Sequence, residues 1–146
     1  MIRAMAVWTT ITATFVMSVG CSTGQQVHSL EGFRSYPAQK VQAEVLDIQL
    51  IRDGAEISLT NTSARAFGET TLWLNQEFSY VIDGIAVGQT VRLDLSEFRN
   101  HHGAYFRAGG FFATERPKNV VLAQLELGED AQSLLGIVVV NGQATR

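Results

Sequence analysis

Two adjacent histidines, His101 and His102, are the residues whose type and spacing best suit a metal ion. Three oxygen-bearing side chains that could complete such a site lie just upstream: Asp94, Glu97 and Asn100. Zinc needs three or four ligands that converge on one point, whereas adjacent side chains on an extended strand point to opposite sides. Both histidines reach one ion only if the backbone turns sharply, which Gly103 permits. A solvated loop is the simpler interpretation, so no cofactor is predicted.

Acid–base or nucleophilic catalysis has a weaker basis in the sequence. Asp83 could pair with Asp94 or Glu97, but cleavage of a glycoside requires two carboxyl groups at a defined separation across a groove. No G-x-S-x-G motif surrounds any serine. We therefore predict that the protein is not an enzyme. A carboxylate-based hydrolase of the cell envelope stays open as an alternative, as does a metal-binding protein that uses His101 and His102.

The amino-terminal residues carry the clearest pattern in the chain. Residues 1–3 include one positive charge, residues 4–17 are mostly apolar and uncharged, and residues 18–20 are small or apolar. This order is typical of an export signal, and the run is short and polar for a spanning helix. Cys21, the only cysteine, follows at once. The arrangement resembles the lipobox of bacterial lipoproteins, although Ser18 stands where such sites usually carry Leu, Val or Ile. An ordinary signal peptidase would also accept this sequence.

The resemblance implies that the mature chain begins at Cys21 with two or three acyl chains attached. Such a lipid anchor holds a protein at a membrane, because one chain alone binds only marginally. Ser22, rather than an aspartate, follows the cysteine, which in such lipoproteins implies sorting to the outer membrane, facing the periplasm. We therefore expect a signal peptide over residues 1–20, a tether over residues 21–40 and a folded domain over residues 41–146.

Composition limits the remaining possibilities. The mature chain has about 126 residues, which suits one domain with a single core. No second cysteine is present, so packing alone must stabilise it. The net charge is −3, and Lys40 and Lys118 are the only lysines. Binding of nucleic acid needs a basic stripe, so nucleic acid is excluded as a partner.

The mature chain alternates between apolar and polar residues over short segments. This pattern predicts strands near residues 41–50, 56–60, 69–75, 78–82, 91–95, 121–127 and 134–140. The apolar set of the first segment changes phase, which predicts a bulge near Val45 or Leu46. Asp53-Gly54 predicts a hairpin turn, and Ser96 is expected to cap one helical turn over residues 96–99. The continuous apolar run at 134–140 predicts a central or covered strand.

Short strands separated by turns predict a single antiparallel, immunoglobulin-like β-sandwich of about seven to nine strands. Trp73, on the third strand, resembles the core tryptophan of immunoglobulin-like domains. Residues 59–63 (LTNTS), 73–75 (WLN), 88–91 (GQTV) and 95–98 (LSEF) are similar to uncharacterised bacterial lipoprotein domains of the FxLYD type. That resemblance implies a sandwich and assigns no site.

Aromatic residues near Gly109-Gly110 predict a possible partner surface made of Tyr105, Phe111 and Phe112. Two successive phenylalanines cannot face the same core layer, and an exposed aromatic patch marks a binding surface. The alternative is that Phe33 and Tyr36 of the tether cover this region. The sequence thus favours a non-catalytic binding or structural module of the envelope, with the membrane and an envelope protein as partners.

Overall fold

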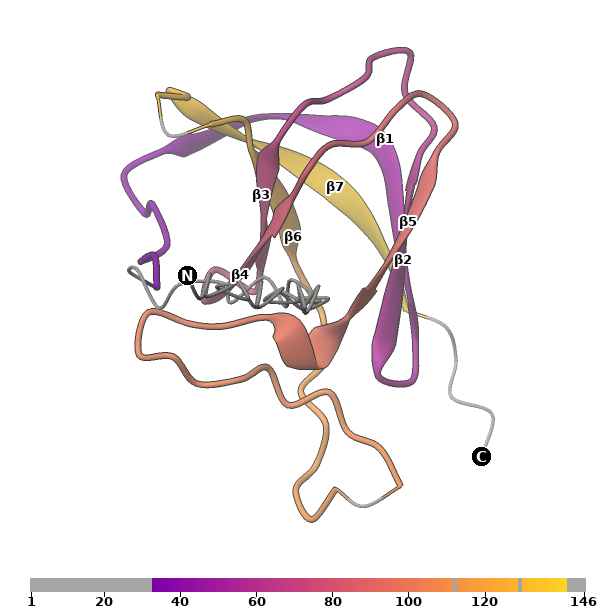
Figure 1. The fold of residues 1–146 in the computed structure, drawn as a ribbon. Helices are drawn as coiled ribbons and strands as arrows, with labels where there is room; N and C mark the ends of the chain where they lie inside the picture. Colours follow the sequence, from indigo (N-terminus) through magenta and orange to yellow (C-terminus); the bar gives the residue numbers. More distant parts are fainter. Residues whose placement is uncertain (1–32, 112, 129, 142–146) are drawn as a thin grey trace, which may run out of the picture.

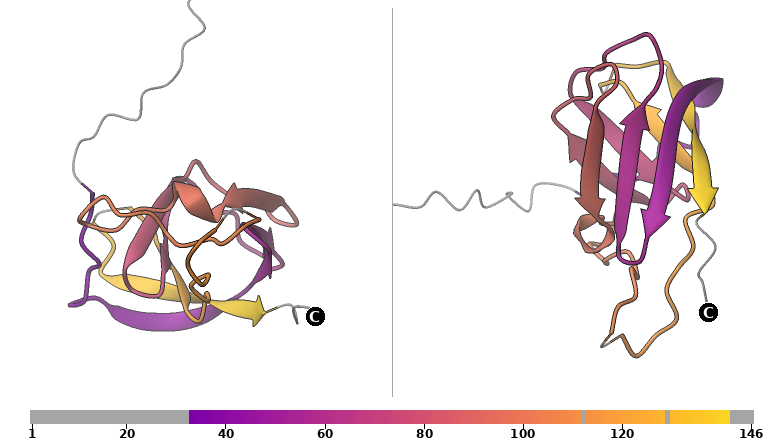
Figure 2. Two further views of the ribbon diagram at one scale, coloured as in Figure 1. Left: turned by 90° about the horizontal axis from the view of Figure 1, so that it is seen from below. Right: turned by 90° about the vertical axis from the view of Figure 1, so that its right-hand side faces the viewer.

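Seven strands form one curved sheet in the computed structural model, which describes residues 33–111, 113–128 and 130–141. The strands are β1 (Val41–Asp53), β2 (Glu56–Asn61), β3 (Thr70–Leu74), β4 (Phe78–Ile82), β5 (Thr90–Asp94), β6 (Ala123–Glu126) and β7 (Ser133–Asn141). Their order is β4-β3-β6-β7-β1-β2-β5. The sheet curls into a half-barrel around the core (Figures 1 and 2). The predicted all-β class is confirmed.

The sheet is mixed, which corrects the prediction of antiparallel pairing throughout. β7 lies beside β1 in parallel, whereas the other neighbouring strands pair antiparallel. Alternation of apolar residues fixes which face of a strand is buried but carries no information on strand direction. The described strands also form one sheet rather than two, so the immunoglobulin-like sandwich is not confirmed. The central position predicted for the run at 134–140 is confirmed, since β7 lies between β6 and β1.

The long strand β1 is irregular where the sequence changes phase. Its register against β7 shifts between Gln42 and Glu44 and again between Leu46 and Gln49, which confirms an irregularity beside Leu46. Leu46, Ile48 and Leu50 are buried, whereas Val45 is exposed. The first half of β1 therefore lies outside the core, and the two shifts bend the strand around the sheet.

The core fills the concave side of the half-barrel. Its fully buried members come from all parts of the sheet and include Ile48, Ile57, Leu59, Leu72, Leu74 and Leu125. The segment after β5 covers the open side, where Phe98 and Phe106 are buried. There Ser79 of β4 exchanges two backbone hydrogen bonds with Arg99. This bridge satisfies part of the edge of β4 that would otherwise be open to another strand.

A single 3-10 turn, η1 (Leu95–Glu97), follows β5. Asp94 caps it, because its side chain accepts a hydrogen bond from the backbone N–H of Ser96 at 2.7 Å. The predicted cap at Ser96 is therefore wrong by two residues. An aspartate at this position satisfies an N–H that has no partner within the turn.

Candidate functional site

The convex face of the sheet carries a second, polar buried layer beneath the segment of residues 33–40, which we call the strap. Strand alternation directs Leu72 and Leu74 into the core, so Thr71 and Trp73 point to the opposite face. Gln124 and Glu126 of β6 share that face, since β6 pairs with β3. All four outward-facing residues are nonetheless buried. The strap contacts this layer through Arg34, Tyr36 and Lys40 before the chain enters β1.

Glu126 is the centre of this layer, with a side chain only 1% exposed. Its Oε1 accepts a hydrogen bond from Nζ of Lys40 at 2.7 Å, and its Oε2 accepts one from Nε1 of Trp73 at 2.9 Å. The Arg34 guanidinium lies 3.2 Å from Oε2 and donates to Oγ1 of Thr71 at 3.0 Å. Two cations of the strap therefore bind one buried carboxylate of the sheet. We call these contacts of Arg34 and Lys40 with Glu126 the clamp.

The ionised form of Glu126 is the one that this environment stabilises. Burial by itself favours the neutral acid, but the hydrogen bonds from Lys40 and Trp73 and the charge of Arg34 outweigh it. The pKa of Glu126 therefore lies below its ordinary value. The carboxylate holds no proton to transfer near neutral pH, and its contacts fasten the strap to the sheet.

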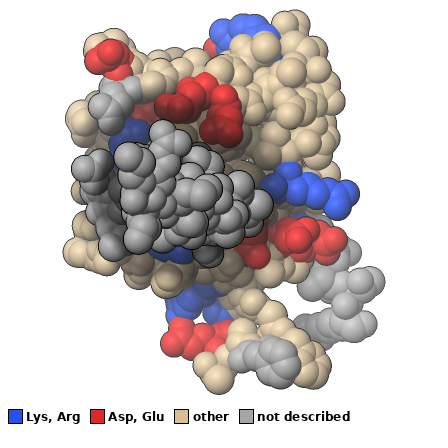
Figure 3. All heavy atoms as spheres, viewed as in Figure 1, with Lys and Arg blue, Asp and Glu red and all other residues tan. Residues whose placement is uncertain are grey.

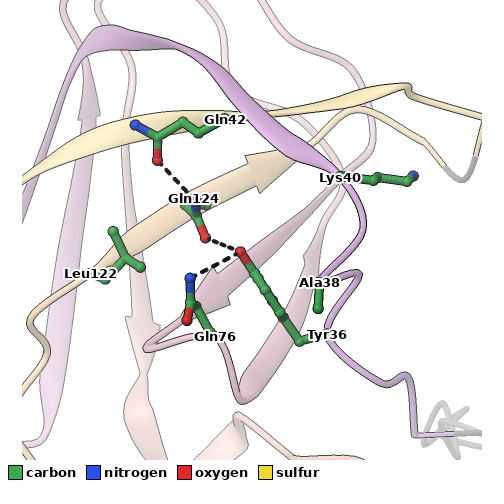
Figure 4. Close-up of a pocket in the computed structure, with 7 residues that line it drawn as sticks. All are labelled: Tyr36, Ala38, Lys40, Gln42, Gln76, Leu122 and Gln124. Carbon is green, nitrogen blue, oxygen red and sulfur yellow. Dashed lines mark hydrogen bonds between the residues drawn. The ribbon is translucent and has the colours of Figure 1, made fainter.

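A groove of about 580 Å³ opens beside this clamp (Figure 4). Its lining comes from the strap, β1, the β3–β4 turn and β6: Tyr36, Ala38, Lys40, Gln42, Gln76, Leu122 and Gln124. The Tyr36 hydroxyl donates to Oε1 of Gln124 at 2.8 Å, and Nε2 of Gln124 donates to Oε1 of Gln42 at 2.8 Å. The Tyr36 ring packs edge-on against Trp73, with centroids 5.5 Å apart.

Gly136 makes this polar chain possible. A Cβ at Gly136 would lie 2.6 Å from Nε2 of Gln42. The glycine on β7 therefore leaves the space through which the Gln42 amide reaches Gln124. A glycine in a strand interior often marks such a close approach.

The structure brings the two predicted metal ligands together. Gly103, with φ of +79°, closes a turn in which its N–H bonds to the carbonyl of Asn100 at 2.9 Å. The rings of His101 and His102 consequently lie with centroids 3.6 Å apart. Both side chains are exposed. Within residues 33–141, masked positions aside, no group of three His, Cys, Asp or Glu side chains is arranged to hold a metal.

Of the carboxylates considered for catalysis, Asp94 has an environment of its own, whereas Glu97 and Asp83 both lie near Tyr80. Asp94 caps η1, and its hydrogen bonds to Ser96 lower its pKa. Glu97 and Asp83 flank Tyr80, whose pKa is raised by burial and then by these two negative charges. The Tyr80 ring also packs against the Phe98 ring, with centroids 5.3 Å apart and ring planes tilted by 33°.

The predicted aromatic surface lies on the long connection between η1 and β6. Tyr105 is 62% exposed, with the Arg99 guanidinium 3.3 Å from the centre of its ring. Phe111, on the same connection, is 96% exposed. Part of this connection forms the loop that projects below the sheet in Figure 1. Arg52 holds the base of this loop by donating to the carbonyls of Ala108 at 2.7 Å and Lys118 at 2.6 Å. Phe112 lies outside the described residues, as does Cys21.

Among the described residues, the face of the molecule seen in Figure 3 has no large patch of one charge. Acidic and basic side chains are interspersed in the view of Figure 3. Arg107 and Glu115, for example, form an exposed ion pair at 3.0 Å within the projecting loop.

Sequence reasoning missed the clamp at Glu126. One signal was available: Trp73, Gln124 and Glu126 occupy the outward positions of strands whose inward positions are apolar. A large aromatic residue such as Trp73 at such a position indicates a covered face, whereas Gln124 and Glu126 by themselves indicate a solvated one. The sequence placed Trp73 in the core, but its indole lies under the strap instead, with its N–H on Glu126.

No helix within the described part of the chain is long and apolar enough to cross a membrane. No protein-family model, curated protein or solved structure matches this chain.

Proposed function

We propose that the protein is a non-catalytic binding or structural module of a bacterial cell envelope, held at the outer membrane by lipid on Cys21 and facing the periplasm. The leader-like order of residues 1–20 supports the anchor. The observation that carries the binding role is the groove beside the strap, whose lining is polar and pre-organised by hydrogen bonds. Ligand sites are usually such pre-formed hollows with a few convergent polar groups.

The clamp determines how closely a lipid anchor on Cys21 would hold the domain to the membrane. Residues 21–33 span at most about 45 Å when fully extended, at roughly 3.5 Å per residue. The strap that follows is fastened to the sheet by Arg34 and Lys40 on Glu126. Lipid on Cys21 would therefore keep the domain close to the bilayer and limit the orientations in which the groove faces the periplasm.

Expression of the full chain in a bacterium with lipoprotein processing tests the anchor. We expect intact-mass spectrometry to find Cys21 as the first residue with acyl groups attached, and the protein to enter the detergent phase on phase partitioning. Cys21→Ser should abolish both results, whereas the control Ser22→Ala should retain them. An unmodified amino terminus, either at Cys21 or upstream of it, would contradict lipid anchoring. Turnover of an ester, peptide or glycoside panel would contradict the non-catalytic assignment.

Metal binding at His101 and His102 is the second candidate, because the turn at Gly103 places their rings 3.6 Å apart. Two imidazoles on one side of a turn can share a Cu²⁺ or Zn²⁺ ion. We expect calorimetric titration with either ion to give a dissociation constant of about 1 µM, lost in His101→Gln and retained in the control His28→Gln. Equal binding by both variants would rule out this site.

A further inference from the structure

The turn between β3 and β4 has a backbone conformation that its sequence does not favour. Asn75 and Gln76 have φ of 54° and 59°. They are the central residues of a four-residue turn closed by the Glu77 N–H on the Leu74 carbonyl at 3.1 Å, within a three-residue connection, since Leu74 pairs with Phe78. Turns with two successive residues at positive φ prefer Asn followed by Gly, because a side chain at the second position is strained. Glutamine therefore stands where glycine would be the more stable choice.

The fold accounts for Asn75 but not for Gln76. The Asn75 side chain accepts from the N–H groups of Val121 and Leu122 at 2.9 and 3.2 Å and donates to the carbonyl of Asn119 at 2.7 Å. Gln76 makes one long hydrogen bond, from its Nε2 to the Tyr36 hydroxyl at 3.4 Å. Its exposed side chain lines the groove. Strained backbone persists where it positions a functional group.

The groove offers hydrogen-bonding groups that neighbouring protein atoms leave open. Gln124 donates one hydrogen bond to Gln42 through Nε2, and Gln42 accepts it through Oε1, but an amide has two donors and an acceptor with two lone pairs. Among the described residues, Nε2 of Gln42 and the carbonyl oxygen of Gln76 have no hydrogen-bond partner. In Figure 4 the Gln42 nitrogen points away from Gln124. A donor of Gln42 and an acceptor of Gln76 therefore remain for a ligand.

The charge of the groove favours a neutral ligand. Lys40 is the only charged residue in its lining, and its ammonium lies 2.7 Å from Glu126. An extended peptide that binds by strand addition needs an open strand edge, and β6 is paired on both sides, with β3 and with β7. The N–H and C=O of Leu122, just before β6, are both bonded to Asn75. Recognition must therefore come from the side-chain amides and the Tyr36 hydroxyl.

We propose that this groove binds a neutral oligosaccharide, whose hydroxyl or acetamido groups pair with the amides of Gln42 and Gln76. Leu122, Ala38 and the Tyr36 ring supply apolar contact for the hydrogen-bearing faces of the sugar rings. The proposal rests on the binding role proposed above and names its ligand class and site.

Saturation-transfer NMR tests the proposal with the full-length chain in a detergent whose head group carries no sugar. The probes are chitohexaose and cellohexaose, both neutral hexasaccharides. We expect saturation transfer to at least one of them with a dissociation constant of about 1 mM or tighter. Gln76→Gly should weaken binding about tenfold or more without lowering the thermal midpoint, because glycine suits the turn. The matched control Gln49→Ala, an exposed glutamine on β1, should bind as the wild type does.

Three outcomes would overturn the proposal: no transfer to either hexasaccharide at about 10 mM, unchanged binding by Gln76→Gly, or equal binding of an anionic sulfated hexasaccharide. If the protein is folded and lipid-anchored but binds neither hexasaccharide, the oligosaccharide proposal is wrong and the proposed envelope role is unaffected. If the protein binds a hexasaccharide but carries no lipid, the lipid anchor is wrong and the sugar site is unaffected.

Discussion

Replacement of Glu126 by alanine is expected to lower the free energy of unfolding by about 2–4 kcal/mol, because it leaves buried partners without the carboxylate. The Trp73 indole N–H, fully buried, would lose its acceptor at 2.9 Å. Lys40 and Arg34 would lose their ion pairs with this carboxylate, although Arg34 is one-third exposed and water recovers part of that loss. The strap would lose its ion pairs with Glu126 of the sheet.

Urea denaturation of the full chain measures this effect. Glu126→Gln keeps an acceptor for Trp73 and should cost less than the alanine variant. The matched control Glu115→Ala removes an exposed ion pair with Arg107 and should change stability by about 0.5 kcal/mol or less. If Glu126→Ala were no more destabilising than Glu115→Ala, the clamp would have no role in stability.

Urea denaturation at several pH values separates the contribution of the Glu126 charge to the free energy of unfolding from that of its packing. A carboxylate whose pKa is lower in the folded state stabilises the protein above its unfolded pKa, and that stability is lost as the pH falls through the folded value. Glu126 and Glu77, whose pKa is lowered chiefly by the hydrogen bond from Lys118, both act in this direction. Wild-type stability should therefore fall below about pH 4.5 more steeply than that of Glu126→Gln.

Replacement of Asn61 by alanine is expected to cost about 2–4 kcal/mol, since several buried hydrogen bonds converge on its fully buried side chain. Its Nδ2 donates to the carbonyls of Arg65 at 2.7 Å, Ala86 at 3.2 Å and Ile85 at 3.3 Å. Its Oδ1 accepts from the backbone N–H of Ser63 at 3.1 Å and from the Ser63 hydroxyl at 2.7 Å. One side chain thus joins the loop after β2 to the loop before β5.

The thermal and urea midpoints of Asn61→Ala, compared with Asn119→Ala, test this role. Asn119 is exposed, and its contact with Asn75 uses the backbone carbonyl, so its truncation should stay within about 0.5 kcal/mol. Asn61→Asp should also destabilise, because it removes the donor and turns a buried charge toward three carbonyl oxygens. Equal stability of the Asn61 and Asn119 alanine variants would show that the two loops are held together by other contacts.

Local patterns in the sequence determined the strands and their turns. The alternation of Ile57 with Leu59 and of Leu72 with Leu74 identified buried faces that the structure confirms. Asp53-Gly54 marked the β1–β2 hairpin, where Asp53 pairs with Glu56. These features depend on side chains two residues apart and on turn conformations that few residues accept, so neighbouring residues suffice to predict them.

The site could be predicted only in fragments. The sequence identified His101 and His102 and the condition under which they could meet, and the turn at Gly103 meets that condition. It gave no indication that Arg34 would contact Glu126, 92 residues away, or that Tyr36 would contact Gln124, 88 residues away. A lone glutamate among apolar strand residues is read as solvent-exposed unless its distant partners are known.

What the sequence determined by itself was the composition of the strands, the faces they bury and a leader-like amino terminus. Only the tertiary structure decided that β7 lies parallel to β1, that one sheet curls around the core, and that the strap covers its convex side. The physical reason is that alternation is identical for parallel and antiparallel neighbours. The partners of a buried charge, moreover, are chosen by where the folded chain brings cations and donors together, not by their spacing along it.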